Sequence, residues 1–315
     1  MKRPSTYRLS VLGIAALLVA ALLIGCGGGA SGASVSGNSE GGTSGPDYTP
    51  PDSPTLSVFH AEAAQTGNGC AIDTSALAEG YVGAAATSSA RLKFQVSKGD
   101  MSYNYDLPGD NTPIVVPLNM GDGAYSFRVM QNTSGNNYVE LFGVIENVKL
   151  NSETAPFLVP NLFVGYNESS AVTAKAHELA EGCVNQADIV RNVYQWVVRN
   201  ITYDHEKAAQ LASATGYVPD PDQTLASGTG ICFDYASLGA AMLRSLGIPC
   251  KVVTGYVSPD DVYHAWNMVY IDGTWESVEI SIKPNSWSRV DLTFAASGAA
   301  STIGDGTSYT DRYTY

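Results

Sequence analysis

Cys232 and His264 are the two residues whose types and surroundings best suit covalent chemistry. Cys232 follows a glycine-rich turn in the segment 228–249, where apolar residues recur every three to four positions until Gly247 and Pro249. We therefore expect the cysteine at a helix N-terminus, where free N–H groups and the helix dipole favour a thiolate. A buried structural cysteine that happens to open a helix is the alternative.

His264 begins an alternating run, 263–275, that is typical of a strand, with Asp272-Gly273 as a tight turn. A cysteine at a helix start and a histidine on a strand are the parts of a nucleophile and base pair. The imidazole takes the thiol proton, and the thiolate attacks a carbonyl carbon. Such a pair also needs a third group that orients the imidazole.

Several motifs occur here in the order and spacing of the core domain of the transglutaminase-like superfamily. They are IVRNVYQWVVRNITYD (189–204), GTGICFDYASL (228–238), LGIP (246–249), HAWN (264–267) and WSRVDLTF (287–294). The stretch from about 188 to 294 resembles that domain, and it covers about a third of the chain. The resemblance implies a papain-like core in which Cys232 attacks a peptide or protein carboxamide and His264 moves the proton. The acceptor is an amine or water.

Two carboxylates compete for the orienting role. The family pattern of Trp, two residues, an aliphatic, Asp, any residue and Thr fits 287–293 closely, and this fit implies Asp291. The same pattern fits 275–281 imperfectly, with Glu279 in the acid position.

Strand geometry alone favours the other candidate. A two-residue turn at Asp272-Gly273 places Glu279 on the face of His264 and Asp291 on the opposite face. Bulges shift registers easily, so the motif outweighs this argument. In the bacterial branch of the family that the sequence after 290 resembles, the residues before the Asp form an extra excursion. The backbone N–H of Cys232 is a natural oxyanion donor, and Tyr203 fits either the cleft or the core.

The N-terminus has the layout of a bacterial lipoprotein signal peptide over residues 1–25. Its positive start is supplied by Lys2, Arg3 and Arg8. An apolar run then ends in Leu-Ile-Gly-Cys at 23–26, which resembles a lipobox. The resemblance implies cleavage before Cys26 and lipid attachment to its sulfur. An uncleaved membrane anchor or an ordinary secretory signal is the alternative.

The rest of the chain divides into three parts. Residues 26–56 are rich in Gly, Ser and Pro and predict a flexible tether. Residues 57–150 contain short alternating runs between turn signals, which predict a β-sandwich-like domain; the runs are 80–86, 91–97, 101–107, 112–118, 123–131 and 137–150. Residues 151–315 form the transglutaminase-like domain, with helices near 170–181 and 188–200 and a polar loop over 205–223. The predicted fold class is α+β, with the Cys232 helix packed on an antiparallel sheet that starts near Cys250.

Composition excludes several functions. The net charge is −13, and removal of the signal peptide takes away three positive charges and no acid, leaving about −16. A chain this acidic without a basic patch predicts no nucleic-acid partner. No motif for a metal, a phosphate or another cofactor is present. Among the remaining cysteines, Cys250 is expected to be a small buried hydrophobe, and Cys70 and Cys183 are a hypothetical disulfide.

Together these features predict a surface enzyme. We expect an extracytoplasmic, lipid-anchored cysteine acyltransferase or hydrolase with Cys232, His264 and Asp291 as its site and peptide or protein as its substrate. The alternative is a non-catalytic surface lipoprotein that binds peptide or glycan.

Overall fold

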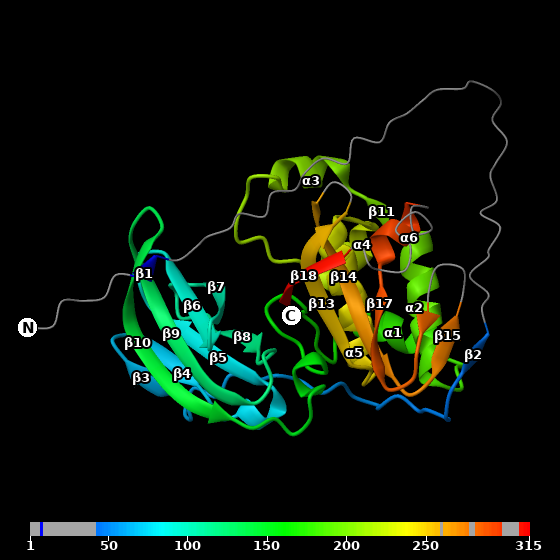
Figure 1. Cartoon of the computed structure of the whole chain (residues 1–315), viewed down its shortest axis with the longest axis horizontal. Coiled ribbons are helices and arrows are strands. Elements are labelled where there is room, and N and C mark those ends of the chain that lie inside the picture. The colour runs from blue at the N-terminus through cyan, green and yellow to red at the C-terminus, as the bar shows by residue number, and fades with distance from the viewer. Residues whose placement is uncertain (1–6, 9–41, 259–260, 277–280, 298–308) are drawn as a thin grey trace, which may run out of the picture.

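The computed structural model describes residues 7–8, 42–258, 261–276, 281–297 and 309–315. Two domains lie side by side, an all-β domain on the left of Figure 1 and a domain of helices around a sheet on the right. The fold is α+β with antiparallel main sheets, as the sequence predicts. Among the described residues, no helix is both long and apolar enough to cross a bilayer.

The first domain consists of two antiparallel sheets. One has the strand order β1-β10-β9-β6-β7 and the other β3-β4-β5-β8. The bounds are β1 Tyr7–Arg8, β3 Gln65–Gly67, β4 Cys70–Asp73, β5 Tyr81–Ala86, β6 Leu92–Lys98, β7 Met101–Leu107, β8 Ile114–Pro117, β9 Gly123–Ser134 and β10 Asn137–Val148, with a 3-10 turn at Leu77–Glu79. Phe94 and Phe127 of one sheet share a buried core with Ile72 and Val82 of the other. The domain is therefore a β-sandwich.

Six strands, β5 to β10, coincide with the runs in which polar and apolar residues alternate. Alternation matches burial most clearly in β7, which has one face in the sandwich core and one toward solvent, whereas β5 is buried along its whole length. Strands β3 and β4, of three and four residues, are missed by the sequence analysis.

The second domain surrounds a four-stranded sheet of order β17-β14-β13-β18. Its strands are β13 Cys250–Val257, β14 Val262–Ile271, β17 Ser286–Val290 and β18 Tyr309–Thr314. Its helices are α1 Ala171–Ala180, α2 Gln186–Asn200, α3 His205–Leu211, α4 Pro221–Ser227, α5 Cys232–Ser245 and α6 Leu292–Ala296. A 3-10 turn at Ala155–Phe157 precedes them, and β11 Thr202–Tyr203 pairs with β12 Thr229–Gly230 in parallel.

Helix α5 lies at the centre of this domain. Every residue from Phe233 to Ser245 is buried, because α5 packs between the sheet and helices α1, α2 and α4. Near its end, the buried guanidinium of Arg244 donates to the backbone oxygens of Val159 and Tyr315, at 2.9 and 2.8 Å. This side chain therefore joins the segment between the domains to the last residues of the chain.

The sequence analysis predicts a polar loop over 205–223, and this prediction is wrong. The segment contains α3 and the first residues of α4, whose N-caps are Asp204 and Asp220. Each carboxylate accepts a backbone N–H of the first turn, and Pro221 occupies the first position of α4. Both helices are short, so their apolar periodicity is too brief to recognise.

The expected hairpin across Asp272-Gly273 is also wrong. Strand β14 pairs with β17, with Tyr270 opposite Trp287. The residues between them leave the sheet: β15 (Thr274–Glu276) pairs with β16 (Ser281–Ile282) and with β2 (Thr43–Ser44). With β16 on one edge and β2 on the other, β15 has no edge left for β14, which pairs with β17 instead. This is the excursion that the family resemblance implies.

Residues 42–56 differ from the expected flexible tether, since they lie along the second domain. The hydroxyl of Thr43 donates to Asp188 at 2.6 Å, and that of Tyr48 donates to the Leu246 carbonyl at 2.8 Å. Gly247 makes room for the tyrosine, because a Cβ there would lie 2.7 Å from its hydroxyl. The blue chain in Figure 1 runs from β2 along both domains to the sandwich. The average composition of residues 42–56 predicts a flexible chain, because it does not reveal the contacts that the single ring of Tyr48 makes.

The four cysteines in the described residues are all free. Cys70 is buried in the sandwich, whereas Cys183 follows α1 and accepts a hydrogen bond from Asn192 at 3.2 Å. The hypothetical disulfide is therefore wrong, because the two thiols belong to different cores. Cys250 is buried at the start of β13, as expected.

Candidate active site

Cys232 is the first residue of α5 and is partly exposed. Its position depends on the turn before it, where Asp234 accepts the N–H of Ile231 at 2.8 Å and closes the first helical turn. Glycine is required at position 230, because a Cβ there would lie 2.6 Å from that of Asp234. The first N–H groups of a helix have no intrahelical partner, so the N–H of Cys232 is available to a ligand.

His264 lies on β14 and is buried. Its Nε2 is 2.9 Å from Oδ2 of Asp291, and the side chain of Cys232 adjoins the ring closely enough to act on its pKa. The ring of Phe294 packs on the imidazole with centroids 4.3 Å apart. Burial acts to lower the pKa of His264, but the Asp291 carboxylate and then Cys232 outweigh it and raise the pKa to about 10. The structure therefore favours a protonated imidazole beside the thiol.

Asp291 is the N-cap of α6, and its buried carboxylate has four donors. Oδ1 accepts the backbone N–H groups of Thr293 and Phe294, at 3.1 and 3.0 Å. Oδ2 accepts from His264 and from the hydroxyl of Tyr309, each at 2.9 Å. The carboxylate is therefore fixed in orientation and stays an acceptor.

The structure thus brings together Cys232, His264 and Asp291, while Glu279 and Cys26 lie outside the described residues. Asp291 meets His264 because β17 ends at Val290, opposite Asn267, so that the chain turns into α6 one residue later. A flat continuation of the strand, as used in the sequence argument, does not allow this turn.

A cleft of about 670 Å³ opens over Cys232 and His264, between the two domains. The sandwich contributes Asn104 of β7 and the ion pair between Lys93 and Asp106, in which Nζ and Oδ1 are 2.7 Å apart. The second domain contributes mostly apolar and aromatic side chains, among them Tyr203, Phe163, Phe233, Tyr263 and Phe294. Tyr203, which the sequence leaves between cleft and core, lines the cleft.

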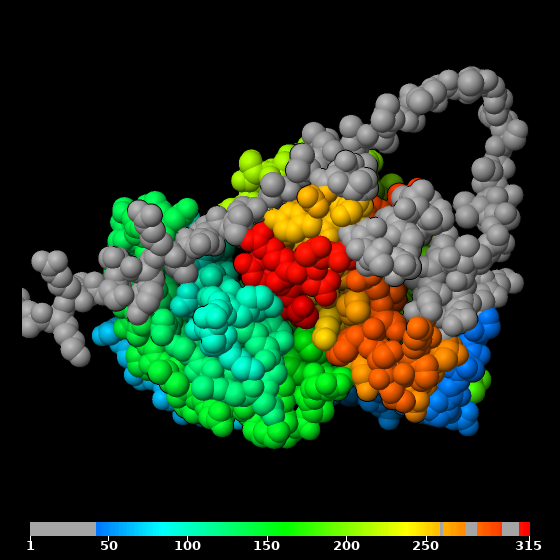
Figure 2. All heavy atoms as spheres, viewed as in Figure 1, coloured from blue at the N-terminus to red at the C-terminus, as the bar shows by residue number. Residues whose placement is uncertain are grey.

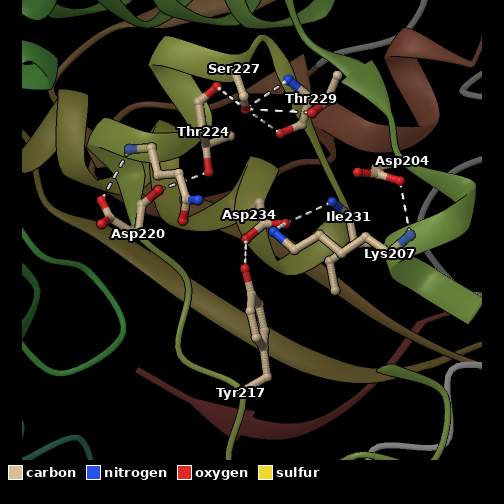
Figure 3. A network of polar contacts seen from close by, with 10 residues as sticks. Asp204, Lys207, Tyr217, Asp220, Thr224, Ser227, Thr229, Ile231 and Asp234 are labelled. Atoms are coloured by element: carbon tan, nitrogen blue, oxygen red, sulfur yellow. Dashed lines mark hydrogen bonds and ion pairs between the residues drawn. The ribbon is translucent and has the colours of Figure 1, made fainter. Parts of the chain in front are cut away.

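The segment that contains α3 and the following loop, residues 205–217, forms a further wall of the cleft. Figure 3 shows how it is fastened: the buried carboxylate of Asp234 accepts from Lys207 Nζ at 2.7 Å and from the hydroxyl of Tyr217 at 2.5 Å. Burial and the adjacent carboxylate raise the pKa of Tyr217, so that its hydroxyl remains a donor. The helix that positions Cys232 therefore also holds this wall.

Sequence reasoning missed the roles of Asp234 and Tyr309. Asp234 carries a detectable signal, an acid at the third position of a helix that begins with Cys232. No sequence signal identifies Tyr309, because only the pairing of strands in the folded sheet brings it to Asp291. Within the described residues, no group of three or more His, Cys, Asp or Glu side chains is arranged to hold a metal ion.

A cysteine at a helix start, a histidine on the neighbouring antiparallel sheet and a carboxylate behind it form the arrangement of papain-like and transglutaminase-like folds. Residues 173–292 match the family model of the transglutaminase-like superfamily, so this part of the chain is a domain of that superfamily.

Individual relatives are distant. The chain is 31% identical over 127 residues to mouse kyphoscoliosis peptidase, covering 35% of this chain and 19% of that protein. It is 26% identical over 137 residues to a UPF0252 protein of Archaeoglobus fulgidus, covering 39% and 43%. The chain thus spans less than half the length of these curated relatives. A solved structure described as a proposed cysteine protease from Cytophaga hutchinsonii shares 15% identity at a TM-score of 0.38, covering 75% of this chain and 83% of that one.

Proposed function

We propose that this protein is a cysteine acyl-transfer enzyme that acts on peptide or protein carboxamides through a thioester on Cys232. The observation that carries the proposal is the alignment of three side chains. Nε2 of His264 lies 2.9 Å from Asp291, and Cys232 adjoins the same ring closely enough to raise its pKa, at the edge of an open cleft.

In the first half of the reaction, the Cys232 thiolate attacks the carbonyl carbon of the amide. The backbone N–H of Cys232 stabilises the oxyanion that forms. The His264 imidazolium then gives its proton to the leaving nitrogen, the C–N bond breaks, and ammonia or an amine departs. A thioester remains on the sulfur.

In the second half, His264 is neutral and takes a proton from the acceptor, which is water or an amine. The acceptor attacks the thioester carbon, the C–S bond breaks, and the thiolate returns beside a protonated imidazole. Asp291 keeps the ring in the orientation that both proton transfers need and stabilises its charged form.

The cleft supports a peptide or protein segment as the substrate. Most of the lining side chains named above are apolar or aromatic, which suits the side chains of an extended chain. The few polar groups on the sandwich wall, Asn104 and the Lys93–Asp106 pair, suit backbone amides.

The decisive experiment uses the protein from residue 42 onward. Site-resolved iodoacetamide labelling should modify Cys232 fastest, because burial raises the pKa of Cys70, Cys183 and Cys250, the last to about 12. At pH 8, a thiol with that pKa is a thiolate in roughly one molecule in ten thousand. The Cys232→Ala variant is the control.

Glutamine-containing peptides are then offered with and without a primary amine. Amide products that contain the amine indicate transfer, and carboxylic acids indicate hydrolysis. Equal labelling of all four thiols, or binding of peptides without turnover, would support the non-catalytic alternative instead.

We also propose that the enzyme works outside the cytoplasm, held to a bacterial membrane by lipid on Cys26. The support is the sequence Leu-Ile-Gly-Cys after an apolar run. In that setting, surface peptides and proteins are the accessible substrates.

A further inference from the structure

Asp291 receives a second side-chain donor that lies outside the region matched by the family model. The hydroxyl of Tyr309 donates to Oδ2, the same oxygen that accepts Nε2–H of His264, and both distances are 2.9 Å. Tyr309 opens β18, whereas the family match ends at residue 292. Two donors therefore share the charge of one carboxylate oxygen.

The ring of Tyr309 is held on two sides. On one side, the rings of Trp266 and Tyr309 pack edge to face, with their centroids 4.8 Å apart and their planes at 76°. The guanidinium carbon of Arg289 lies 4.1 Å from its centroid. Burial and the neighbouring Asp291 raise the pKa of Tyr309, so that the phenol remains protonated and keeps donating.

The other end of β18 is fastened to the sandwich domain. The N–H of Thr314 donates to the hydroxyl of Tyr103 at 3.2 Å, and the amide of Asn119 donates to the carbonyl of Thr314. The ring of Tyr313 packs edge-on against that of Tyr103, with centroids 5.2 Å apart. Figure 2 shows these last residues, in red, filling the seam between the green sandwich and the yellow and orange sheet.

We propose that Tyr309 is a positioning residue of the active site, which orients Asp291 and weakens its hold on the His264 proton. The inference rests on the proposed function. Without the phenol, Oδ2 would place more of its negative charge on His264, and the imidazolium would keep its proton to higher pH. With the phenol, the ring can both accept and release a proton during the two halves of the reaction.

The groups that face His264 determine what a titration will report. Cys232 from α5 and Asp291 from the start of α6 act on the ring directly, and Tyr309 from β18, with Arg289 of β17 against its own ring, contacts Asp291. Among these, only the Tyr309 hydroxyl can be removed without changing the charge of the site.

The experiment measures the rate at which iodoacetate alkylates Cys232 between pH 6 and 11. The anionic reagent is attracted by the imidazolium, so the rate falls where His264 loses its proton. In Tyr309→Phe we expect this alkaline fall to move up by about half to one pH unit. In Tyr313→Phe, which removes a hydroxyl from the same strand without touching Asp291, the fall should stay where it is.

A second Tyr309 variant should move the alkaline fall in the alkylation rate in the opposite direction. Incorporation of 3-fluorotyrosine at position 309 makes a stronger donor of nearly the same shape, and the alkaline fall should move down. Imidazole NMR of His264 follows the same titration independently of any reagent.

An unchanged profile in both Tyr309 variants, or a downward shift in Tyr309→Phe, overturns the inference while the proposed function stands. If the wild-type protein shows no selective reaction at Cys232, the proposed function itself fails. A merely structural role for Tyr309 would lower all rates without moving the alkaline fall.

Discussion

The hydroxyl of Tyr217 lies 2.5 Å from Oδ1 of Asp234, so the wall of the cleft over residues 205–217 is fastened to the helix that presents Cys232. Lys207 reaches the other oxygen of the same carboxylate. Cys232 and one wall of the cleft therefore depend on the same buried carboxylate.

Tyr217→Phe should loosen that wall. Removal of one hydrogen bond to a buried carboxylate costs about 1.5–3 kcal/mol locally. Hydrogen exchange should quicken over 205–217, and KM for peptide substrates should rise several-fold with a smaller change in kcat. The Tyr256→Phe variant, on β13 and away from Asp234, is the control. If exchange over 205–217 is unchanged, Asp234 does not hold the wall.

Asp291→Asn and Glu279→Gln should have very different effects. The asparagine keeps the shape but offers His264 the wrong partner, and in well-studied triads such a change lowers turnover on the order of 10⁴-fold. Glu279→Gln should lower turnover less than about twofold. Thiol labelling and amide turnover of the two variants, measured side by side, decide the matter. The opposite ranking would transfer the orienting role to Glu279.

The stability of the fold should depend on pH through His264. Its pKa is raised from its ordinary value to about 10, so the folded state holds a proton that the unfolded state releases near pH 6.5. The resulting stabilisation is full below about pH 6.5 and is lost as the pH rises toward 10, on the order of a few kcal/mol in total. Urea unfolding across this range measures it.

The matched control for this measurement is Asp291→Asn, which removes the main cause of the raised pKa. Its stability should vary less across the same pH window. A wild-type stability that is flat from pH 6.5 to 10 contradicts the protonated state assigned to His264.

Replacing Cys26 should release the protein from membranes. Cys26→Ala removes the sulfur to which lipid would be attached. In a fractionated bacterial host, the wild type should stay with membranes after a high-salt wash, whereas the variant should appear in the soluble fraction. Retention of the variant would instead indicate that the apolar run is an uncleaved anchor.

Local patterns predicted much of this fold. Alternation located strands β5 to β10, and the glycine-rich turn before Cys232 located the start of α5. The family motif also selected Asp291, the carboxylate that the structure places against His264. These features depend on neighbours in the sequence, which is why they are visible in it.

The relationships that the sequence missed are non-local. Strands β18 and β17 lie on opposite edges of one sheet, and Tyr309 reaches Asp291 past Trp266 of β14; no period in the sequence reveals this arrangement. The hairpin register failed because β2, more than two hundred residues earlier, pairs with β15. Tyr48 was overlooked because the composition of its segment predicts a disordered chain.

Residues 42–56 should detach under tension before either domain unfolds. A force applied upstream of Gly42 first loads the pairing of β2 with β15 and the contacts of Tyr48, before it reaches either core. Once released, residues 42–56 span at most about 50 Å at full extension. A two-residue strand and a few hydrogen bonds yield at lower force than a sandwich or a buried helix. In the proposed lipid-anchored enzyme, this segment would therefore detach first under tension and leave the proposed active site folded.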